Sequence, residues 1–234
     1  MSNSLKTIVI TGCTRGIGRA LTEKFTQLGH NVIGCGRNDL LIDELRHHPG
    51  PSENFSIVNV LKPTQVRNWA EDVVQRHGVP DIIINNAGVA HASVAFWDIE
   101  PDDFDRTIDI NIKGVANVAR AFIPFMLKKG SGIIINMSSG VGTYAIPDFS
   151  GYAASKHAIE GLSKSIAKDL PQGIACIPLQ PGMVNTEMLQ DHLGLESADK
   201  GVSPAEWAEY AAPYILTLGP EHSGESMRVE KPNA

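Results

Sequence analysis

Three side chains in the stretch 139–156 have the types and the spacing that suit proton transfer. Lys156 follows Tyr152 by four residues, so on a helix both side chains lie on the same face. A neighbouring ammonium group favours phenolate, so we expect it to lower the pKa of the tyrosine from ~10. Ser139, at the end of a strand facing that helix, would hold a substrate oxygen beside the phenol. For an isolated pair of this spacing, a surface tyrosine and a solvated lysine are the alternative.

A glycine cluster stands between a predicted strand, 7–11, and a predicted helix, 17–28. Gly12 permits a tight turn, Gly16 allows the backbone to approach a pyrophosphate, and Gly18 allows close packing of helix and strand. Free N–H groups at the start of the helix then bind the anion. The other expected contacts in this turn come from Thr14, Arg15 and Ile17. The spacing differs from the G-x-G-x-x-G fingerprint, but the position of the cluster between a strand and a helix still favours a dinucleotide site. The turn is not a P-loop, because no Gly-Lys-Ser/Thr follows.

The end of the second predicted strand, 31–36, indicates which dinucleotide binds. Proteins that use NAD usually place an acidic residue there for the ribose 2′-hydroxyl. Here the strand ends in Gly36, Arg37 and Asn38, with no acid before Asp39. Arg37 can pair with a 2′-phosphate, for which the glycine leaves room, and Arg15 lies in the adjacent turn. The sequence therefore predicts NADP(H), unless both arginines are solvated surface charges.

Short apolar runs alternate with amphipathic stretches along the chain. We expect strands at 7–11, 31–36, 55–60, 81–85, 132–138, 174–179 and 226–229, and helices at 17–28, 39–47, 64–77, 101–129, 150–169 and 203–218. Apolar strands separated by helices predict an α/β fold, with a mostly parallel sheet of about seven strands and helices on both faces. The length favours one domain, 1–234. A bend is expected at Pro124, and the irregular stretch 186–203 is predicted to be a substrate loop.

Composition excludes several classes of function. The formal net charge of −6 argues against a nucleic-acid surface, and no apolar run approaches the ~18 residues that a membrane span needs. The three scattered cysteines favour reduced thiols and a cytoplasmic protein. No histidine or cysteine spacing is typical of a metal site, so we expect no metal. An S-x-x-K match at Ser165–Lys168 lacks the accompanying motifs of acyl-transferring serine enzymes.

Taken together, the motifs resemble the short-chain dehydrogenase/reductase family. The shared segments, in family order and spacing over about residues 5–229, are TGCTRGIG, NNAG at 85–88, NIKG at 111–114, NMSS at 136–139, YAASK at 152–156 and PGMVNT at 181–186. The resemblance implies a Rossmann-like, doubly wound fold and an NADP(H)-dependent oxidoreductase that reduces a ketone or aldehyde to an alcohol, or catalyses the reverse reaction. A non-catalytic NADP-binding regulator on the same fold is the alternative.

The resemblance also implies roles for individual residues. Tyr152 would be the general acid in reduction and the base in oxidation. Lys156 would bind the nicotinamide ribose and lower the pKa of Tyr152, while Ser139 would polarise the carbonyl group. Asn111 would hold a water molecule that links Lys156 to solvent. Further cofactor contacts are expected from Asn38, Asn59, Val60, Asn86, Ala87, Gly88, Pro181, Gly182, Val184 and Thr186.

The residues that flank these motifs predict the substrate pocket. They are His91, Val141, Tyr144, Ile146, Phe149, Met183, Met188, Leu189 and Leu193. Because most of these side chains are apolar, we expect an uncharged, fairly apolar, small-molecule carbonyl or alcohol as substrate. The family resemblance further implies a homodimer or homotetramer, in which helices 102–129 and 150–169 would pair with copies of themselves.

Overall fold

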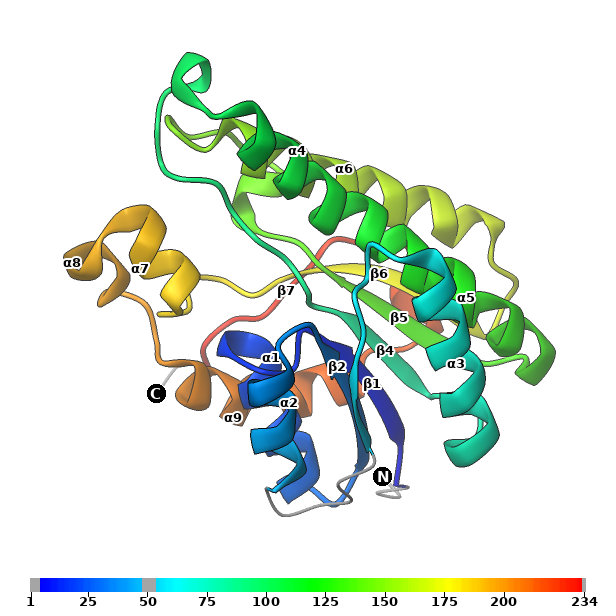
Figure 1. The fold of residues 1–234 in the computed structure, drawn as a ribbon. Helices are drawn as coiled ribbons and strands as arrows, with labels where there is room; N and C mark the ends of the chain where they lie inside the picture. The colour runs from blue at the N-terminus through cyan, green and yellow to red at the C-terminus, as the bar shows by residue number, and fades with distance from the viewer. Residues whose placement is uncertain (1–4, 48–53, 233–234) are drawn as a thin grey trace.

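A computed structural model of the chain describes residues 5–47 and 54–232 (Figure 1). Its strands form one sheet in the order β3-β2-β1-β4-β5-β6-β7, and each neighbouring pair is parallel. The strands are β1 (Thr7–Thr11), β2 (Asn31–Gly36), β3 (Phe55–Ile57), β4 (Ile82–Asn85), β5 (Gly132–Met137), β6 (Ile174–Gln180) and β7 (Met227–Arg228). The chain order reverses between β1 and β4, and the crevice at such a reversal is where open α/β sheets bind ligands. The predicted doubly wound parallel sheet is confirmed.

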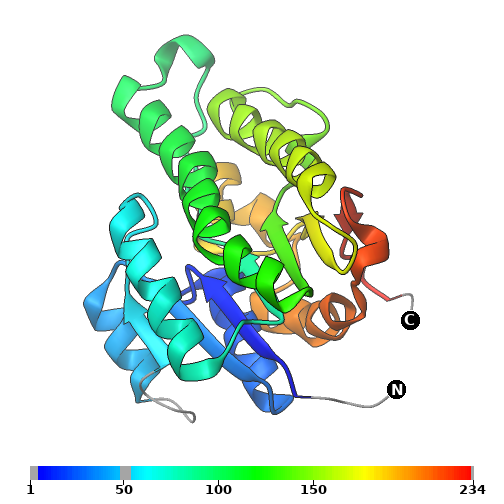
Figure 2. The same ribbon diagram turned by 90° about the vertical axis from the view of Figure 1, so that its right-hand side faces the viewer.

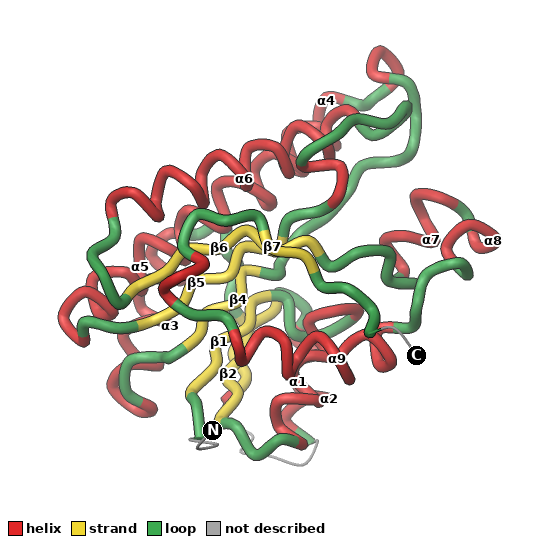
Figure 3. Tube along the Cα trace, turned by 180° about the vertical axis from the view of Figure 1, so that it is seen from behind, coloured by secondary structure: helices red, strands yellow, loops and turns green. Residues whose placement is uncertain are grey.

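Helices cover both faces of this sheet, as Figures 1, 2 and 3 show from three sides. They are α1 (Gly16–Gln27), α2 (Asp39–Arg46), α3 (Pro63–His77), α4 (Pro101–Ile108), α5 (Val115–Lys129), α6 (Ser150–Asp169), α7 (Glu187–Leu193), α8 (Leu195–Ala198) and α9 (Pro204–Thr217). Three pairs of helices pack against each other: α1 with α9, α3 with α5, and α4 with α6. The short helices α7 and α8 stand at one edge of the molecule (Figure 1).

Side-chain alternation along the strands divides the core into two. Ile8 and Ile10 of β1 belong to the cluster that contains residues of α1 and α9, whereas Val9 belongs to the cluster that contains residues of α3 and α5. All three side chains are fully buried. Successive residues of a strand point to opposite faces, so a strand covered on both sides must be apolar throughout. This explains why β1 reads as an unbroken apolar run.

Three sequence predictions about the elements need correction. The helix expected over 101–129 is interrupted by the π-helical turn Asp109–Gly114, whereas Pro124 lies inside α5, which continues through it. The third strand ends at Ile57 because the side chain of Asn59 accepts a hydrogen bond from the N–H of Leu61 and turns the chain. The stretch 186–203 is not irregular, since it contains α7 and α8. Among the described residues, no helix is long and apolar enough to cross a membrane.

Candidate active site

The glycine turn is held against the neighbouring strand by backbone hydrogen bonds. The N–H groups of Gly12 and Cys13 both donate to the carbonyl oxygen of Cys35, and Gly12 has a φ of +66°, which favours glycine. A Cβ atom on Gly18 would clash with the carbonyl oxygen of Gly12. Gly18 therefore provides the close packing of helix on strand that the sequence predicts, although it does not line the cavity described below.

The end of β4 braces this turn from the other side. The side-chain amide of Asn86 donates to the carbonyl oxygens of Thr11 and Gly12, each at 3.0 Å. In return, the hydroxyl oxygen of Thr11 accepts from the N–H groups of Asn86 and Ala87. These bonds fix the carboxyl ends of β1 and β4 relative to each other, at the point where the order of the strands reverses.

A cavity of about 370 Å³ opens at this point and contains most of the predicted cofactor contacts. Its lining includes Gly12, Thr14, Arg15, Gly16, Ile17, Arg37, Asn38, Val60, Asn86, Ala87, Gly88, Tyr152, Lys156, Pro181 and Thr186. Thus the first glycine turn, the end of β2, the turn after β4 and the start of α6 all meet at one cavity. The same cavity is lined by Cys35, Gly36, Leu41, Val58, Val89, Ile110, Met137, Ser138 and Glu187, which the sequence analysis did not select as contacts.

Four predicted cofactor contacts and two predicted catalytic residues are not part of this lining: Gly18, Asn59, Gly182, Val184, Asn111 and Ser139. Val184 is 4% exposed and pairs with Val202 in an isolated parallel bridge, so its side chain belongs to the core. Val58 lines the cavity in place of Asn59. Alternation would have indicated this, because Val58 and Val60 are two residues apart and share a face in an extended segment.

The charges around the cavity suit a phosphorylated nucleotide. Helix α1 begins with no side-chain cap and no acidic residue in its first turn, so its first N–H groups and its positive end remain available to an anion. Arg37 lines the cavity at the end of β2 and is exposed. Arg15 lines it too and forms an exposed ion pair, 3.0 Å long, with Glu187 at the start of α7. The residues present therefore fit a dinucleotide with an additional phosphate.

Packing around Gly36 also explains why a glycine stands at this position. It is buried, and a Cβ atom there would lie 2.8 Å from the methyl group of Thr14 and 3.3 Å from Ile42. An aspartate at position 36 would therefore have to push aside the side chains of Thr14 and Ile42 before it could contact a ribose. The acid that NAD-binding proteins place at this strand end is excluded here by packing as well as by sequence.

Lys156 and Tyr152 share α6, but the lysine does not act on the phenol in the expected way. The Nζ atom of Lys156 donates to the carbonyl oxygen of Met137 at 2.7 Å and lies 5.5 Å from the centroid of the Tyr152 ring. Burial lowers the pKa of Lys156, which is 7% exposed, to about 8. Burial raises the pKa of Tyr152 to about 12, and a hydrogen bond with the side chain of Ser139 offsets part of that rise. The expected fall in the pKa of Tyr152 is therefore wrong for this arrangement, because desolvation dominates.

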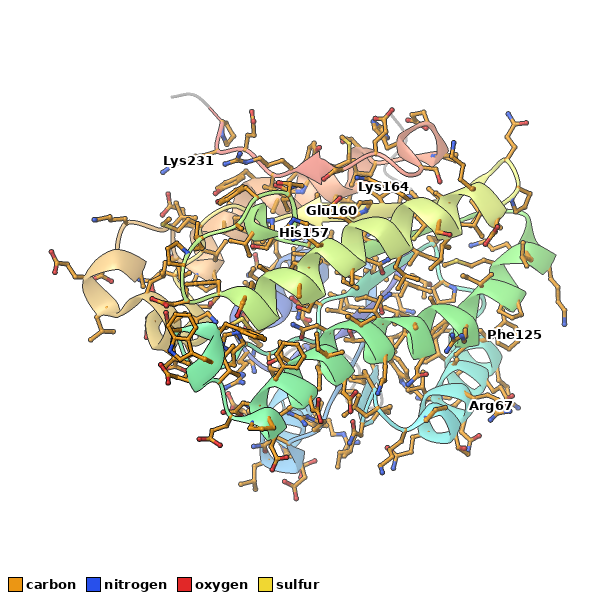
Figure 4. All side chains as sticks on the ribbon, turned by 90° about the horizontal axis from the view of Figure 1, so that it is seen from above. Arg67, Phe125, His157, Glu160, Lys164 and Lys231 are labelled. Carbon is orange, nitrogen blue, oxygen red and sulfur yellow. The ribbon has the colours of Figure 1, made fainter. Side chains whose placement is uncertain are left out.

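The two neighbouring serines have different partners. The side chain of Ser139 hydrogen-bonds that of Tyr152 and thereby lowers the pKa of the phenol. The hydroxyl of Ser138 donates to the carboxylate of Glu160 at 2.6 Å, and the hydroxyl of Ser226 donates to the same oxygen. Figure 4 labels Glu160 on α6, beside the segment that carries β7. Ser139, chosen on spacing, is thus the serine that contacts Tyr152, while Ser138 is engaged in a buried network.

Asn111 lies in the π-helical turn, where it is 1% exposed. Its amide donates to the carbonyl oxygen of Val89 and to the hydroxyl of Ser155, and its side-chain oxygen accepts from the N–H of Val89. Both amide hydrogens are therefore engaged within the chain. The water relay through Asn111 stays a prediction, and these amide hydrogens do not serve it.

The predicted substrate pocket is only partly assembled around this cavity. Of its candidates, only Met188 is part of the lining. His91, Val141 and Phe149 are buried, whereas Tyr144, Ile146 and Met183 are exposed. The sequence analysis missed His192 of α7, which packs against the rings of Phe149 and Tyr152. Its only signal was its position inside the predicted substrate loop. Among the described residues, no group of three or more His, Cys, Asp or Glu residues could hold a metal ion.

A family model described as short chain dehydrogenase matches residues 6–194. This chain belongs to that family. A curated relative, the NADPH-dependent pterin aldehyde reductase of Arabidopsis thaliana, is 42% identical over 226 residues, which cover 96% of this chain and 93% of the relative. A 3-oxoacyl-(acyl-carrier-protein) reductase of Thermotoga maritima is 36% identical over 190 residues, covering 79% of this chain and 76% of that protein. The chain is therefore an oxidoreductase of the short-chain dehydrogenase family.

A solved structure has the same fold over nearly the whole chain. The short-chain dehydrogenase from Shigella flexneri, complexed with NADP, superposes with a TM-score of 0.87 at 23% identity, covering 99% of this chain and 100% of that one. At this identity the comparison shows the fold, and it confirms the Rossmann-like arrangement expected from the sequence. The activity of this chain has to be argued from its own cavity and side chains.

Proposed function

We propose that this short-chain dehydrogenase reduces an aldehyde to a primary alcohol, with NADPH as the hydride donor. One observation carries the proposal: Tyr152, whose phenol stays protonated at neutral pH, lines the same cavity as the glycine turn and hydrogen-bonds Ser139. A protonated phenol is the form that a general acid must have to complete a carbonyl reduction. The 42% identical relative, named as a pterin aldehyde reductase, supports a heteroaromatic aldehyde as the substrate class.

The cofactor is NADP(H). Arg37 faces the cavity where NAD-binding proteins carry an acid, and Gly36 has no space for one. NADPH bound along this cavity supplies the hydride for the carbonyl carbon. The free N–H groups at the start of α1 would hold its pyrophosphate, Arg37 its 2′-phosphate, and Lys156 its nicotinamide ribose.

Each remaining step belongs to a side chain of this chain. Ser139 donates a hydrogen bond to the carbonyl oxygen and so polarises the bond that receives the hydride. Tyr152 transfers its proton to the same oxygen, which gives the alcohol and leaves a phenolate. Lys156, with a pKa of about 8, is predominantly charged at neutral pH and stabilises that phenolate from one helical turn away. The phenolate then recovers a proton from solvent.

A non-catalytic NADP-binding regulator is the second candidate on this fold. A pure binder has no need of a partly buried phenol that is bonded to a serine and lines the cavity, so Tyr152 and Ser139 favour the enzyme. A cytoplasmic location and a homodimer or homotetramer stay predictions, and sedimentation at micromolar concentration would test the assembly.

The test is NADPH oxidation with a panel of aldehydes, ketones and quinones, run in parallel on the protein and on Tyr152→Phe. The proposal expects turnover with aldehydes that disappears in the variant, and nucleotide binding in both. Tyr214→Phe is a matched control, since Tyr214 lies on α9 and is not part of the cavity lining. Tight NADPH binding with no turnover on any member of the panel would favour the regulator.

A further inference from the structure

His91 is a buried histidine that bonds directly to the backbone of Tyr152. It is 2% exposed, and its Nε2 atom lies 3.2 Å from the N–H of Tyr152. Its Nδ1 atom lies 2.6 Å from the carbonyl oxygen of Ala92. A backbone N–H only donates and a carbonyl oxygen only accepts, so Nε2 must be the acceptor and Nδ1 must carry the hydrogen. These two bonds fix one neutral tautomer of His91.

The bond to Tyr152 satisfies a group that the helix itself leaves open. The first N–H groups of an α-helix have no partner within the helix, and Phe149, which precedes α6, offers no side-chain cap. His91 fills this role from the segment that follows β4. A Cβ atom on Gly151 would lie 2.9 Å from the His91 ring, so the glycine next to Tyr152 allows the imidazole to approach.

We propose that His91 is a positioning residue, which holds the first turn of α6, and with it the phenol of Tyr152, in the orientation needed for proton transfer. This inference rests on the proposed function. It also replaces the sequence-based expectation that His91 lines the substrate pocket. Misplacing a reacting group by about 1 Å can cost roughly 10²-fold in rate, so a bond of this kind is visible in kcat.

The test compares His91→Gln, whose side-chain oxygen can accept near the position of Nε2, with His91→Leu, which cannot accept. We expect His91→Leu to lower kcat by about 10- to 100-fold with little change in the Kd of NADPH, and His91→Gln to recover most of the loss. Wild-type kcat in His91→Leu, or no recovery in His91→Gln, would overturn the proposal.

A second measurement separates this inference from the proposed function. Nitrogen NMR of histidine-labelled protein should show His91 as the Nδ1-protonated tautomer, whether or not any aldehyde turns over. A His91 ring protonated at Nε2 would contradict the positioning role even in an active enzyme. Lack of turnover with the expected tautomer present would instead count against the proposed reaction, and with it against a catalytic purpose for His91.

A different observation carries a second inference, at His192 of α7. The ring is 8% exposed, and its centroid lies 4.7 Å from that of Phe149 and 5.9 Å from that of Tyr152. Its Nε2 atom is buried and has no hydrogen-bond partner among the described residues. A buried polar atom without a partner is unfavourable, so a ligand that supplies the partner gains affinity.

The geometry points to a polar subsite beside Tyr152, in which Nε2 of His192 hydrogen-bonds a ring nitrogen or hydroxyl of the aromatic group that carries the aldehyde. This inference also rests on the proposed function, and it adds one requirement: the substrate has a hydrogen-bonding heteroatom near its carbonyl group. An entirely apolar substrate would leave Nε2 unpaired.

The test uses two aldehydes of similar shape, quinoline-2-carbaldehyde and naphthalene-2-carbaldehyde. We expect kcat/KM to favour the quinoline by about 10-fold or more, and His192→Phe to remove that preference by slowing only the quinoline. His157→Phe is the matched control, since His157 is an exposed histidine of α6 (Figure 4). The same ratio in His192→Phe and the unmodified protein, or no preference at all, would overturn the subsite. If neither aldehyde reacts, calorimetric binding of quinoline and naphthalene to the NADP⁺-loaded protein decides the subsite independently of turnover.

Discussion

The nucleotide side and the substrate side of the cavity are formed by different kinds of group: backbone atoms on the first and side-chain rings on the second. On the nucleotide side, the backbone N–H groups of Gly12 and Cys13 donate to Cys35, and the side chain of Asn86 braces the turn. On the substrate side, the contacts are between rings: His192 packs on Phe149 and Tyr152. A backbone site can hold the same cofactor in many sequences, whereas a site made of side chains changes with each substitution. This difference explains why one fold serves many substrates with one nucleotide.

Tyr152→Phe should have the largest effect on kcat and should leave nucleotide binding almost unchanged. Loss of a placed proton donor is expected to lower kcat by about 10²- to 10⁴-fold, because this residue alone completes the reduction. The Kd of NADPH should change little, since the nucleotide side is held by backbone groups. Steady-state kinetics and nucleotide fluorescence titration measure the two quantities. A variant with near-normal kcat would remove Tyr152 from the mechanism.

Arg37→Ala should weaken the nucleotide side alone. A hydrogen bond to a charged group contributes ~1.5–3 kcal/mol, so NADPH affinity should fall about 10- to 150-fold, while NADH binding stays nearly unchanged. Arg67→Ala is the matched control, because Arg67 is an exposed arginine on α3 (Figure 4). Titration of both variants with both nucleotides measures the effect. Equal losses for NADPH and NADH would show that Arg37 does not contact a 2′-phosphate.

Lys156 should give the nucleotide-stripped protein a characteristic pH dependence. Its folded pKa of about 8 lies below its ordinary value of 10.5, so between these values the unfolded chain binds more protons than the folded chain. Unfolding free energy should therefore rise with pH in this window, by at most about 1.4 kcal/mol per pH unit from this group. Denaturant unfolding from about pH 8 to 10, compared with Lys156→Met, isolates the contribution. Parallel pH profiles for the two proteins would contradict the lowered pKa.

Thr186 lies where the nucleotide side and the substrate side meet, and Thr186→Ala should have the smallest effect, a change in KM for the aldehyde. The hydroxyl oxygen of Thr186 accepts from the N–H of Leu189 and caps α7, the helix that carries His192. Loss of a cap costs about 1 kcal/mol, so KM for the aldehyde should rise about 5-fold. Thr186→Ser keeps the cap and should retain the original KM. If Thr186→Ala leaves KM for the aldehyde unchanged, α7 has no part in holding the substrate.

The sequence predicts the nucleotide side well because that side depends on short-range patterns. The turn around Gly12, the acid-free end of β2 at Arg37 and the brace at Asn86 each lie within a few residues of a strand end. The alternation of apolar runs with amphipathic stretches also predicts most of the strands and helices correctly. The cofactor contact expected at Val184 stays a prediction, since a pairing with Val202 buries its side chain and no local pattern records such a pairing.

The substrate side was harder to predict because its contacts join residues far apart in the chain. The bond from Tyr152 to His91 spans 61 residues, and the contact with His192 depends on how α7 folds back. The prediction of a lowered pKa for Tyr152 was wrong for a related reason. The spacing places Lys156 on the same helix face, but the desolvation of the phenol depends on tertiary packing. Desolvation then outweighs the neighbouring charge.

The most direct test of the proposed reaction follows the hydride itself. The protein is incubated with NADPH that carries deuterium at the reactive carbon of the nicotinamide and with quinoline-2-carbaldehyde, and the products are analysed by mass spectrometry and NMR. We predict one alcohol, with deuterium on its carbinol carbon, for each NADP⁺ formed, and no alcohol above background with Tyr152→Phe. Bound NADPH that is never oxidised, or alcohol formed equally by Tyr152→Phe, would contradict the proposal that Tyr152 completes an NADPH-dependent carbonyl reduction.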